Sequence, residues 1–432
     1  MTLTLTGEAQ TLQTASIEDK LSAERAAVAT LEGKTIDGTN NTLIVPQSQV
    51  TGLTESLSRK SYRGSDFTVL GDSITSTNAS TASDSPGHAW HTVLAALSGG
   101  RMTWRQGSAS GGATVQQIRD THLPEVLAIS PRPALCIVFG GTNNVGSADY
   151  DLDSDIAALV QIYDALEAVG IRPVAVLITP RASATDFVPQ WNHRVLAIAR
   201  QRGYDVLDFF SPLVDSADGS LLSEYATDAI HPNNLGHTRL GDKAWSVLSP
   251  RFPSRFVHLS GYATDGDDLL GGDGFFLADG NADGRGDGWN GSGNVSIVTE
   301  GGLSWQRITW ETGDAPGVAL LQKINIASGF SDGDTLELSM RMRIVGRDAG
   351  ESLLSSINVE LRDAPSGGAV IGRFGIGANL PDGNYVLAAR GVIPAGTLGL
   401  RVNIQAEYGA LADYYLEVAQ VSLRNLTAIG AS

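Results

Sequence analysis

Between residues 65 and 253, short apolar runs alternate with amphipathic helical patterns, and this alternation constrains the fold more than any other feature. The predicted strands are residues 67–70, 102–105, 134–139, 173–178 and 205–207. The predicted helices are residues 90–97, 115–121, 154–169, 190–202 and 235–248. Parallel strands need long crossover connections, so alternation of this kind predicts a parallel sheet with helices on both faces.

From Gly261 onward the alternation gives way to short period-two stretches separated by Gly, Asp and Pro turns. Examples are "NVSIVTE", "TLELSMRMRIVG" and "LRVNIQAEY". Evenly spaced strands of this kind are typical of an antiparallel sandwich or jelly roll. A chain of 432 residues is too long for one ordinary core. We therefore predict an N-terminal segment (1–62), an α/β domain (63–258) and a β-sandwich domain (259–432).

The N-terminal segment has a heptad-like pattern. Ile17, Leu21, Val28 and Leu31 take seam positions, with Glu24 at the remaining one. A helix this short is not stable alone. It is predicted either to pack against further copies, as in a homotrimer, or to lie as a single amphipathic helix on its own domain.

The sequence that follows, "LEGKTIDGTNNTLIVPQSQVTGLTESL", resembles connector segments of phage tail fibres and tail-associated proteins. The resemblance implies a virion appendage, commonly trimeric, that is joined through its N-terminus to other tail proteins.

Composition disfavours several partners. The net charge of -17 repels nucleic acid and anionic lipid. The N-terminus lacks the basic start and apolar core of a signal peptide, and no apolar run is long enough to cross a membrane. We expect cytosolic synthesis of a soluble protein. The single cysteine, Cys136, lies in an apolar run and is predicted to be a buried small hydrophobe, so neither an intrachain disulfide nor a cysteine metal site is expected.

Polar, glycine-containing turns follow the first three predicted strands of the α/β region. They are Gly71-Asp72-Ser73, "RQGSASGGAT" and "GGTNN". Carboxyl ends of parallel strands share one sheet edge, so these turns are expected to converge. A fourth stretch, "TDAIHPNNLGH", places Asp228 and His231 three residues apart at the start of a predicted helix, with Pro232 in its first turn. At that spacing a carboxylate can orient an imidazole toward a serine hydroxyl.

These four blocks together resemble the SGNH (GDSL-type) hydrolase family over about residues 66–248. The resemblance implies a flavodoxin-like three-layer α/β/α domain and ester hydrolysis through an acyl-enzyme, with no cofactor. Carried over by position, Ser73 matches the nucleophile, His231 the base and Asp228 the residue that orients the base. Gly111 and Asn143 match donors to the oxyanion, together with the N–H of Ser73.

The chain departs from the family pattern in three places. Asn144 stands where an acidic residue is usual, and Arg105 stands where the second block usually has asparagine. One residue is inserted in that block, so Gly112 remains an alternative to Gly111.

The substrate prediction rests on the loop after Ser73. Residues 75–86 are small and polar, which favours a short acyl group on a soluble carbohydrate over a lipid. Trp90 and Trp191 are interpreted either as sugar-stacking rings or as partly buried helix residues. Trp104 is predicted to lie in the core.

The stretch "FFLADGNADGRGDGW" resembles the start of jelly-roll carbohydrate-binding modules. It contains Asp279, Asn281, Asp283 and Asp287, the spacing of a calcium loop, although Asn290 holds the place of the closing carboxylate. A structural calcium and a plain Gly/Asp-rich turn are both open readings of this stretch.

We therefore predict a phage tail-associated esterase that removes O-acetyl or other short acyl groups from a bacterial surface polysaccharide, acting outside the cell that made it. The alternatives are a receptor-binding adhesin built on an inactive esterase fold, and a broader lipase or thioesterase.

Overall fold

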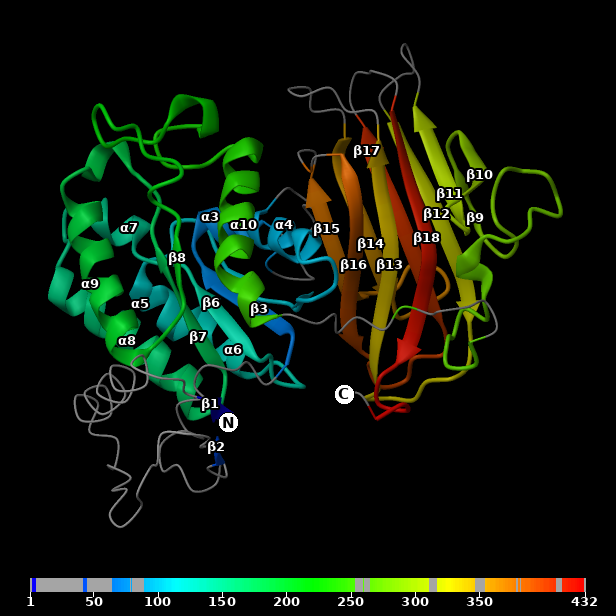
Figure 1. Cartoon of the computed structure of the whole chain (residues 1–432), viewed down its shortest axis with the longest axis horizontal. Coiled ribbons are helices and arrows are strands. Elements are labelled where there is room, and N and C mark those ends of the chain that lie inside the picture. The colour runs from blue at the N-terminus through cyan, green and yellow to red at the C-terminus, as the bar shows by residue number, and fades with distance from the viewer. Residues whose placement is uncertain are drawn as a thin grey trace. The chain divides into compact units, whose positions relative to one another are not determined.

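The computed structural model (Figure 1) describes residues 2–4, 42–44, 64–77, 79, 89–252, 259, 265–310, 317–345, 354–377, 380, 382–408 and 414–430. The chain divides into two compact units, Met1–Arg63 and Gly64–Ser432. In the first unit, β1 (Thr2–Thr4) pairs antiparallel with β2 (Thr42–Ile44). The predicted heptad helix and most of the predicted connector lie outside the described residues.

A parallel sheet forms the first part of the second unit, in the order β4-β3-β6-β7-β8, with the short β5 also paired to β3. The strands are β3 (Asp66–Gly71), β4 (Thr103–Trp104), β5 (Ser108–Ala109), β6 (Leu135–Val138), β7 (Arg172–Leu177) and β8 (Val206–Asp208). All four residues of β6 are buried, as expected for a strand covered on both faces. The predicted parallel α/β region is confirmed.

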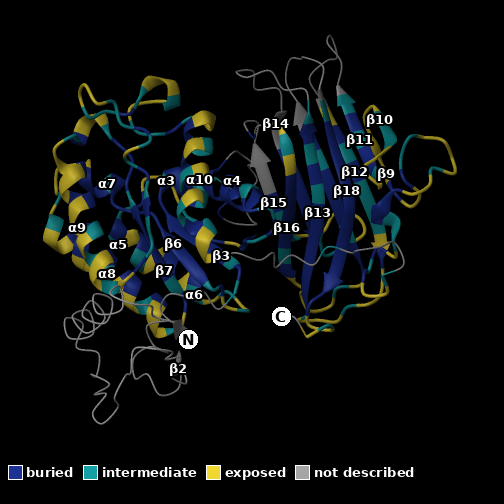
Figure 2. Ribbon diagram, viewed as in Figure 1, coloured by how far each residue is buried: buried dark blue, intermediate teal, exposed yellow. Residues whose placement is uncertain are grey.

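Helices pack around this sheet (Figure 1). They are α3 (Ser73–Ser76), α4 (Trp90–Leu97), α5 (Val115–Gln117), α6 (Leu123–Leu127), α7 (Thr142–Val145), α8 (Leu152–Ala168), α9 (Phe187–Arg202) and α10 (Asn234–Leu248). A π-helical turn, Ile118–His122, joins α5 to α6. In the α/β part, exposed residues gather on helices and loops, whereas most residues of the parallel strands are buried (Figure 2).

The start of α10 differs from the prediction. Its N-cap is Asn233, whose side chain accepts from the N–H of Gly236. Pro232 precedes the cap and forms an isolated antiparallel bridge with Ala226. The prediction that Pro232 occupies the first helical turn is therefore wrong, because the asparagine supplies the capping oxygen one residue later.

The two tryptophans considered for sugar stacking are both fully buried. Trp90 donates from Nε1 to the Thr75 hydroxyl at 3.3 Å and packs edge-on against Phe209. The reading of Trp90 and Trp191 as sugar platforms is wrong, because both rings fill the core. Trp104 and Cys136 are buried as predicted.

The C-terminal part of the unit is built from antiparallel strands, as predicted. They are β9 (Asn290–Ser292), β10 (Val295–Glu300), β11 (Leu303–Trp310), β12 (Gly317–Ile326), β13 (Thr335–Val345), β14 (Leu354–Arg362), β15 (Val370–Gly377), β16 (Gly383–Val392), β17 (Leu400–Tyr408) and β18 (Tyr414–Asn425). Their orders are β10-β11-β18-β13-β16 and β15-β14-β17-β12-β9. Buried aliphatic residues alternate along β17, the pattern of a sheet with one face in a core. A jelly-roll topology stays a prediction.

The parallel sheet and one antiparallel sheet are continuous. Ala389 of β16 pairs in parallel with Trp104 of β4. Next to this bridge, Arg390 forms ion pairs with Asp66 at the start of β3 and with Glu337 of β13. The α/β and all-β parts are thus joined through backbone pairing and buried charge.

Candidate active site

Ser73 lies at the carboxyl end of β3, on a sharp strand-to-helix turn. Asp72 caps α3, its Oδ1 accepting from the N–H of Ile74 at 3.0 Å. Gly71 is required just before it, because a Cβ there would lie 2.6 Å from Thr75. The turn therefore holds the serine at the sheet edge where ligands collect in open α/β folds.

The structure brings Ser73, His231 and Asp228 together. Ser73 Oγ lies 2.8 Å from His231 Nε2, and His231 Nδ1 lies 2.8 Å from Asp228 Oδ2. A carboxylate can only accept, so Nδ1 carries the proton and the neutral Nε2 accepts from the serine hydroxyl. This is the arrangement in which an imidazole can take a proton from a nucleophile.

Local backbone contacts fix the histidine loop. Asp228 Oδ1 accepts from the N–H groups of Ile230 and His231, both at 2.8 Å. The Thr227 N–H donates to the His231 carbonyl at 2.8 Å, and Asn233 N–H to the Tyr225 carbonyl at 2.7 Å. The loop therefore presents the imidazole in one orientation.

Two carboxyl groups near the site have opposite environments. The His231 side chain and the backbone N–H groups that Asp228 accepts from lower the pKa of Asp228 to about 2, so it is ionised at neutral pH. Burial raises the pKa of Asp72 to about 7, against the lowering effect of the hydrogen bond that it accepts from the Ile74 N–H. Asp72 is thus a buried, titrating neighbour of the serine.

Gly111 lies in the turn that follows β5. Leu70 pairs with Ser108 and Gly71 with Ala109, so β5 ends beside the end of the strand that leads into Ser73. The following Gly112 takes the left-handed φ of +76° in the turn. This turn is exposed to solvent.

Asn143 contacts the same turn from α7. Its Nδ2 donates to the Ala113 carbonyl at 3.0 Å, and the Ala113 N–H donates to the Ser110 carbonyl at 3.3 Å. The structure therefore brings the two predicted oxyanion positions, Gly111 and Asn143, into one hydrogen-bonded loop.

Two of the three departures from the family pattern, Asn144 and Arg105, have structural partners. Asn144 is buried, accepts from the Val115 N–H at 2.9 Å and donates to Gln116 Oε1 at 3.0 Å. An amide can make both contacts, whereas a carboxylate can only accept. Arg105 forms an ion pair with Asp66 at 3.0 Å and so belongs to the junction with the all-β part.

Sequence reasoning missed a buried histidine beside this loop. His122 lies between Ser108 and Ser110, which contact its two ring nitrogens. Its sequence context, "IRDTHLP", contains none of these partners, so no local pattern marks it.

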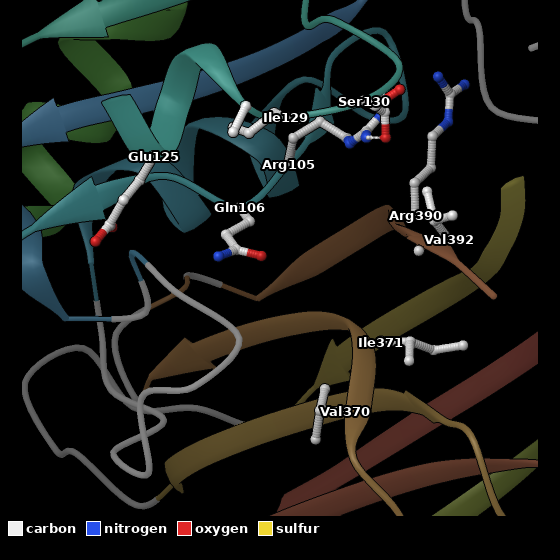
Figure 3. Close-up of a pocket in the computed structure, with 11 residues that line it drawn as sticks. Arg105, Gln106, Glu125, Ile129, Ser130, Val370, Ile371, Arg390 and Val392 are labelled. Atoms are coloured by element: carbon white, nitrogen blue, oxygen red, sulfur yellow. Dashed lines mark hydrogen bonds between the residues drawn. The ribbon is translucent and has the colours of Figure 1, made fainter. Parts of the chain in front are cut away.

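A cavity of about 400 Å³ lies where the loop after β4 and the end of α6 face β15 and β16. Figure 3 shows Gln106 and Glu125 on the α/β side, with Val370 and Ile371 across from them. Arg390 also lines it. Ser73 and His231 do not line this cavity, so it is a separate feature of the molecule.

The predicted calcium loop is closed by its own backbone. Asp279 accepts from the N–H groups of Asp283 and Gly284, and Asp287 accepts from the Gly280 N–H. Asn281 bonds to Asp283 through its side chain at 3.1 Å. Within the described residues, no group of three or more His, Cys, Asp or Glu side chains is arranged to hold a metal. Calcium binding here stays a prediction.

Comparison with known protein families finds a match within the α/β part. The model of the GDSL-like Lipase/Acylhydrolase family matches residues 69–239. None of the curated proteins matches the chain. Of the helices that the structure describes, none has the length and apolar character needed to span a bilayer.

Three solved structures illustrate the similarity. A member of the lipolytic protein G-D-S-L family from Veillonella parvula is 21% identical, covering 43% of this chain and 98% of that chain, with a TM-score of 0.36. A GDSL-like lipase from Bacteroides thetaiotaomicron is 18% identical (44% and 88%, TM-score 0.33). A carbohydrate esterase family 3 protein from Talaromyces cellulolyticus is 16% identical (44% and 98%, TM-score 0.34).

Proposed function

We propose that the GDSL-like acylhydrolase domain, residues 69–239, is a serine esterase that acts through an acyl-enzyme on Ser73. The observation that carries the proposal is the hydrogen-bonded chain from Ser73 through His231 to Asp228, with both contacts at 2.8 Å. Its position beyond the carboxyl end of β3 and the family match support the same reaction class.

In the acylation step, the Ser73 hydroxyl proton moves to His231 Nε2 as the oxygen attacks the ester carbonyl carbon. Asp228, ionised at neutral pH, stabilises the imidazolium that forms. The tetrahedral intermediate collapses when the bond to the alcohol oxygen breaks and His231 returns its proton to that oxygen. The acyl group then remains on the serine.

In the deacylation step, a water molecule gives a proton to His231 Nε2 and attacks the acyl carbon, which releases the carboxylic acid and restores Ser73. The negative oxygen in both steps would accept hydrogen bonds from the N–H groups of Ser73 and Gly111 and from the Asn143 amide. Each such donor typically lowers the barrier by about 3 kcal/mol.

The exposure of the histidine and its partner favours a bulky, soluble substrate. About 40% of the His231 side chain and 54% of the Asp228 side chain are exposed. An open site admits an acyl group carried on a polymer, whereas a lipase encloses a long acyl chain in an apolar pocket. We therefore favour a short acyl group, such as O-acetyl, on a bacterial surface polysaccharide.

The biological context is proposed from the sequence. The N-terminal segment would attach the protein to other virion tail proteins, as a homotrimer in one reading, and the enzyme would act outside the cell. The all-β part would bind carbohydrate. If residues 279–287 bind calcium, millimolar Ca²⁺ should raise the thermal midpoint, and an unchanged midpoint would remove calcium from the proposal.

The second candidate is a receptor-binding adhesin on an inactive esterase fold, and a lipase or thioesterase is the third. Ser73→Ala should abolish p-nitrophenyl acetate hydrolysis and fluorophosphonate labelling, whereas Ser211→Ala, on an exposed loop, should change neither. Wild-type protein that neither labels nor hydrolyses would favour the adhesin. Acetate release from a panel of acetylated bacterial glycans, compared with longer acyl esters, tests the substrate class.

A further inference from the structure

A second buried hydrogen-bond chain lies next to the proposed active site. Ser110 Oγ lies 2.9 Å from His122 Nε2, and His122 Nδ1 lies 2.7 Å from Ser108 Oγ. Ser108 Oγ donates to Glu125 Oε2 at 2.5 Å. Ser108 and His122 are buried, while Ser110 and Glu125 are exposed at the two ends.

The carboxylate sets the direction of the two bonds nearest to it. Glu125 accepts from the Ser108 hydroxyl, so Ser108 must in turn accept from His122, whose Nδ1 therefore carries a proton. When the ring carries only this proton, Nε2 accepts from the Ser110 hydroxyl. The serine hydroxyl is thereby held in one rotamer against a buried, oriented ring.

Ser110 immediately precedes Gly111, and its backbone carbonyl closes the turn. That carbonyl accepts from the Ala113 N–H at 3.3 Å, and the Ala113 carbonyl accepts from Asn143 Nδ2 at 3.0 Å. The exposed turn is thus anchored on one side by His122 and on the other by Asn143. Among the described residues other than the chain neighbours, no heavy atom lies within 4 Å of a Cβ added at Gly111 or Gly112. Packing against neighbouring side chains therefore does not hold the turn.

We propose that His122 is a positioning residue, which acts through Ser110 to hold the Gly111 turn in the geometry that stabilises the oxyanion. This inference rests on the proposed esterase function. Because the oxyanion exists only after attack, a loosened turn reduces transition-state stabilisation and leaves ground-state binding of the ester unchanged. A misplaced donor typically costs about 10- to 100-fold in rate.

The test compares Ser110→Ala, His122→Phe and the double variant by kcat and KM on p-nitrophenyl acetate. Each should lower kcat about 10- to 100-fold at an unchanged KM. The double variant should lose no more than the single variants, since both cut one chain. Ser110→Thr, which keeps the hydroxyl, should retain most of the rate. Ser110→Ala removes only an exposed hydroxyl, so its kcat still tests the proposal if His122→Phe fails to fold.

Arg119→Ala is the matched control, because this half-buried residue lies in the same π-helical turn but bonds to Asp120 and Gln161 and not to the His122 chain. It should leave kcat at the wild-type value. The midpoints of the pH–rate profile should also stay unchanged in Ser110→Ala, because the His231–Asp228 pair is untouched.

Unchanged kcat in Ser110→Ala, a loss carried by KM, or additive losses in the double variant would each overturn the positioning role. Fluorophosphonate labelling of Ser110 in Ser73→Ala would also overturn it, by making Ser110 a nucleophile. Activity that survives in Ser73→Ala would instead refute the esterase proposal itself, so the two failures are distinguishable.

Discussion

Replacing Asp72 by asparagine should remove a specific pH dependence from the stability of this protein. Asp72 is fully buried and accepts from the Ile74 N–H through Oδ1. Among the described residues, its Oδ2 has no hydrogen-bond partner. Asparagine keeps the capping oxygen and carries no charge, so Asp72→Asn isolates the ionisation of the carboxyl group from its structural role.

The magnitude follows from the pKa. Burial raises the pKa of Asp72 from 3.8 to about 7, and each pKa unit corresponds to about 1.4 kcal/mol. A carboxyl group with a raised pKa binds its proton more tightly in the folded state. The stabilisation that protonated Asp72 adds to the free energy of unfolding is therefore fully present below pH 3.8, and it is lost as the pH rises through about 7. Between pH 5 and pH 8 the wild type should lose about 3 kcal/mol that Asp72→Asn does not lose.

Urea unfolding followed by tryptophan fluorescence, at pH 5 and pH 8, measures this difference. The quantity compared is the pH-dependent change in the free energy of unfolding of the wild type minus that of Asp72→Asn. Asp186→Asn, which alters an exposed carboxylate, should behave as the wild type does. If Asp72→Asn and the wild type lose the same free energy between the two pH values, the argument from burial is refuted.

Three further predictions concern the site and its support. Asp228→Asn should lower kcat on p-nitrophenyl acetate about 100-fold or more, because an amide does not hold the imidazole tautomer; a kcat near that of the wild type would contradict this. Gly141→Ala should lower the thermal midpoint, because its Cβ would lie 2.3 Å from a buried tryptophan ring at a φ of +114°. The control Gly64→Ala, whose Cβ meets only an ordinary contact at 3.6 Å, should leave the midpoint nearly unchanged. Arg390→Ala should lower the free energy of unfolding by about 3 kcal/mol, because it removes the guanidinium that buried Glu337 pairs with; urea unfolding measures this, and a loss under about 1 kcal/mol would contradict it.

The long elements could be predicted from the sequence, whereas the short ones that carry the site could not. The helices α4 and α10 have enough apolar residues to reveal their periodicity, and the buried strands β3, β6 and β7 are marked by short apolar runs. The helices α3 and α7 have four residues each, too few for any period, and β5 has the two small residues Ser108 and Ala109. Local contacts define two of them instead, since Asp72 caps α3 and β5 pairs with β3.

The spatial meeting of Ser73 and His231 was predictable, because parallel strands bring their carboxyl ends to one edge. The contacts of His122 were not, since its partners lie 12 and 14 residues earlier in the chain and depend on the exact path of the turn. The burial of Trp90 could not be predicted either, because the sequence of a helix does not determine how deeply a tryptophan ring enters the core. The order of the strands and helices could thus be predicted from the sequence, whereas the surroundings of individual side chains could not.

The backbone pairing of Trp104 with Ala389 bears on how this protein can be dissected. A chain cut after residue 252 would lose the strand that covers the outer edge of its parallel sheet, together with a cation that neutralises Asp66. Uncovered strand edges template association with other chains. The α/β half expressed alone should therefore be prone to aggregation, and keeping both halves in one polypeptide should give a better-behaved protein.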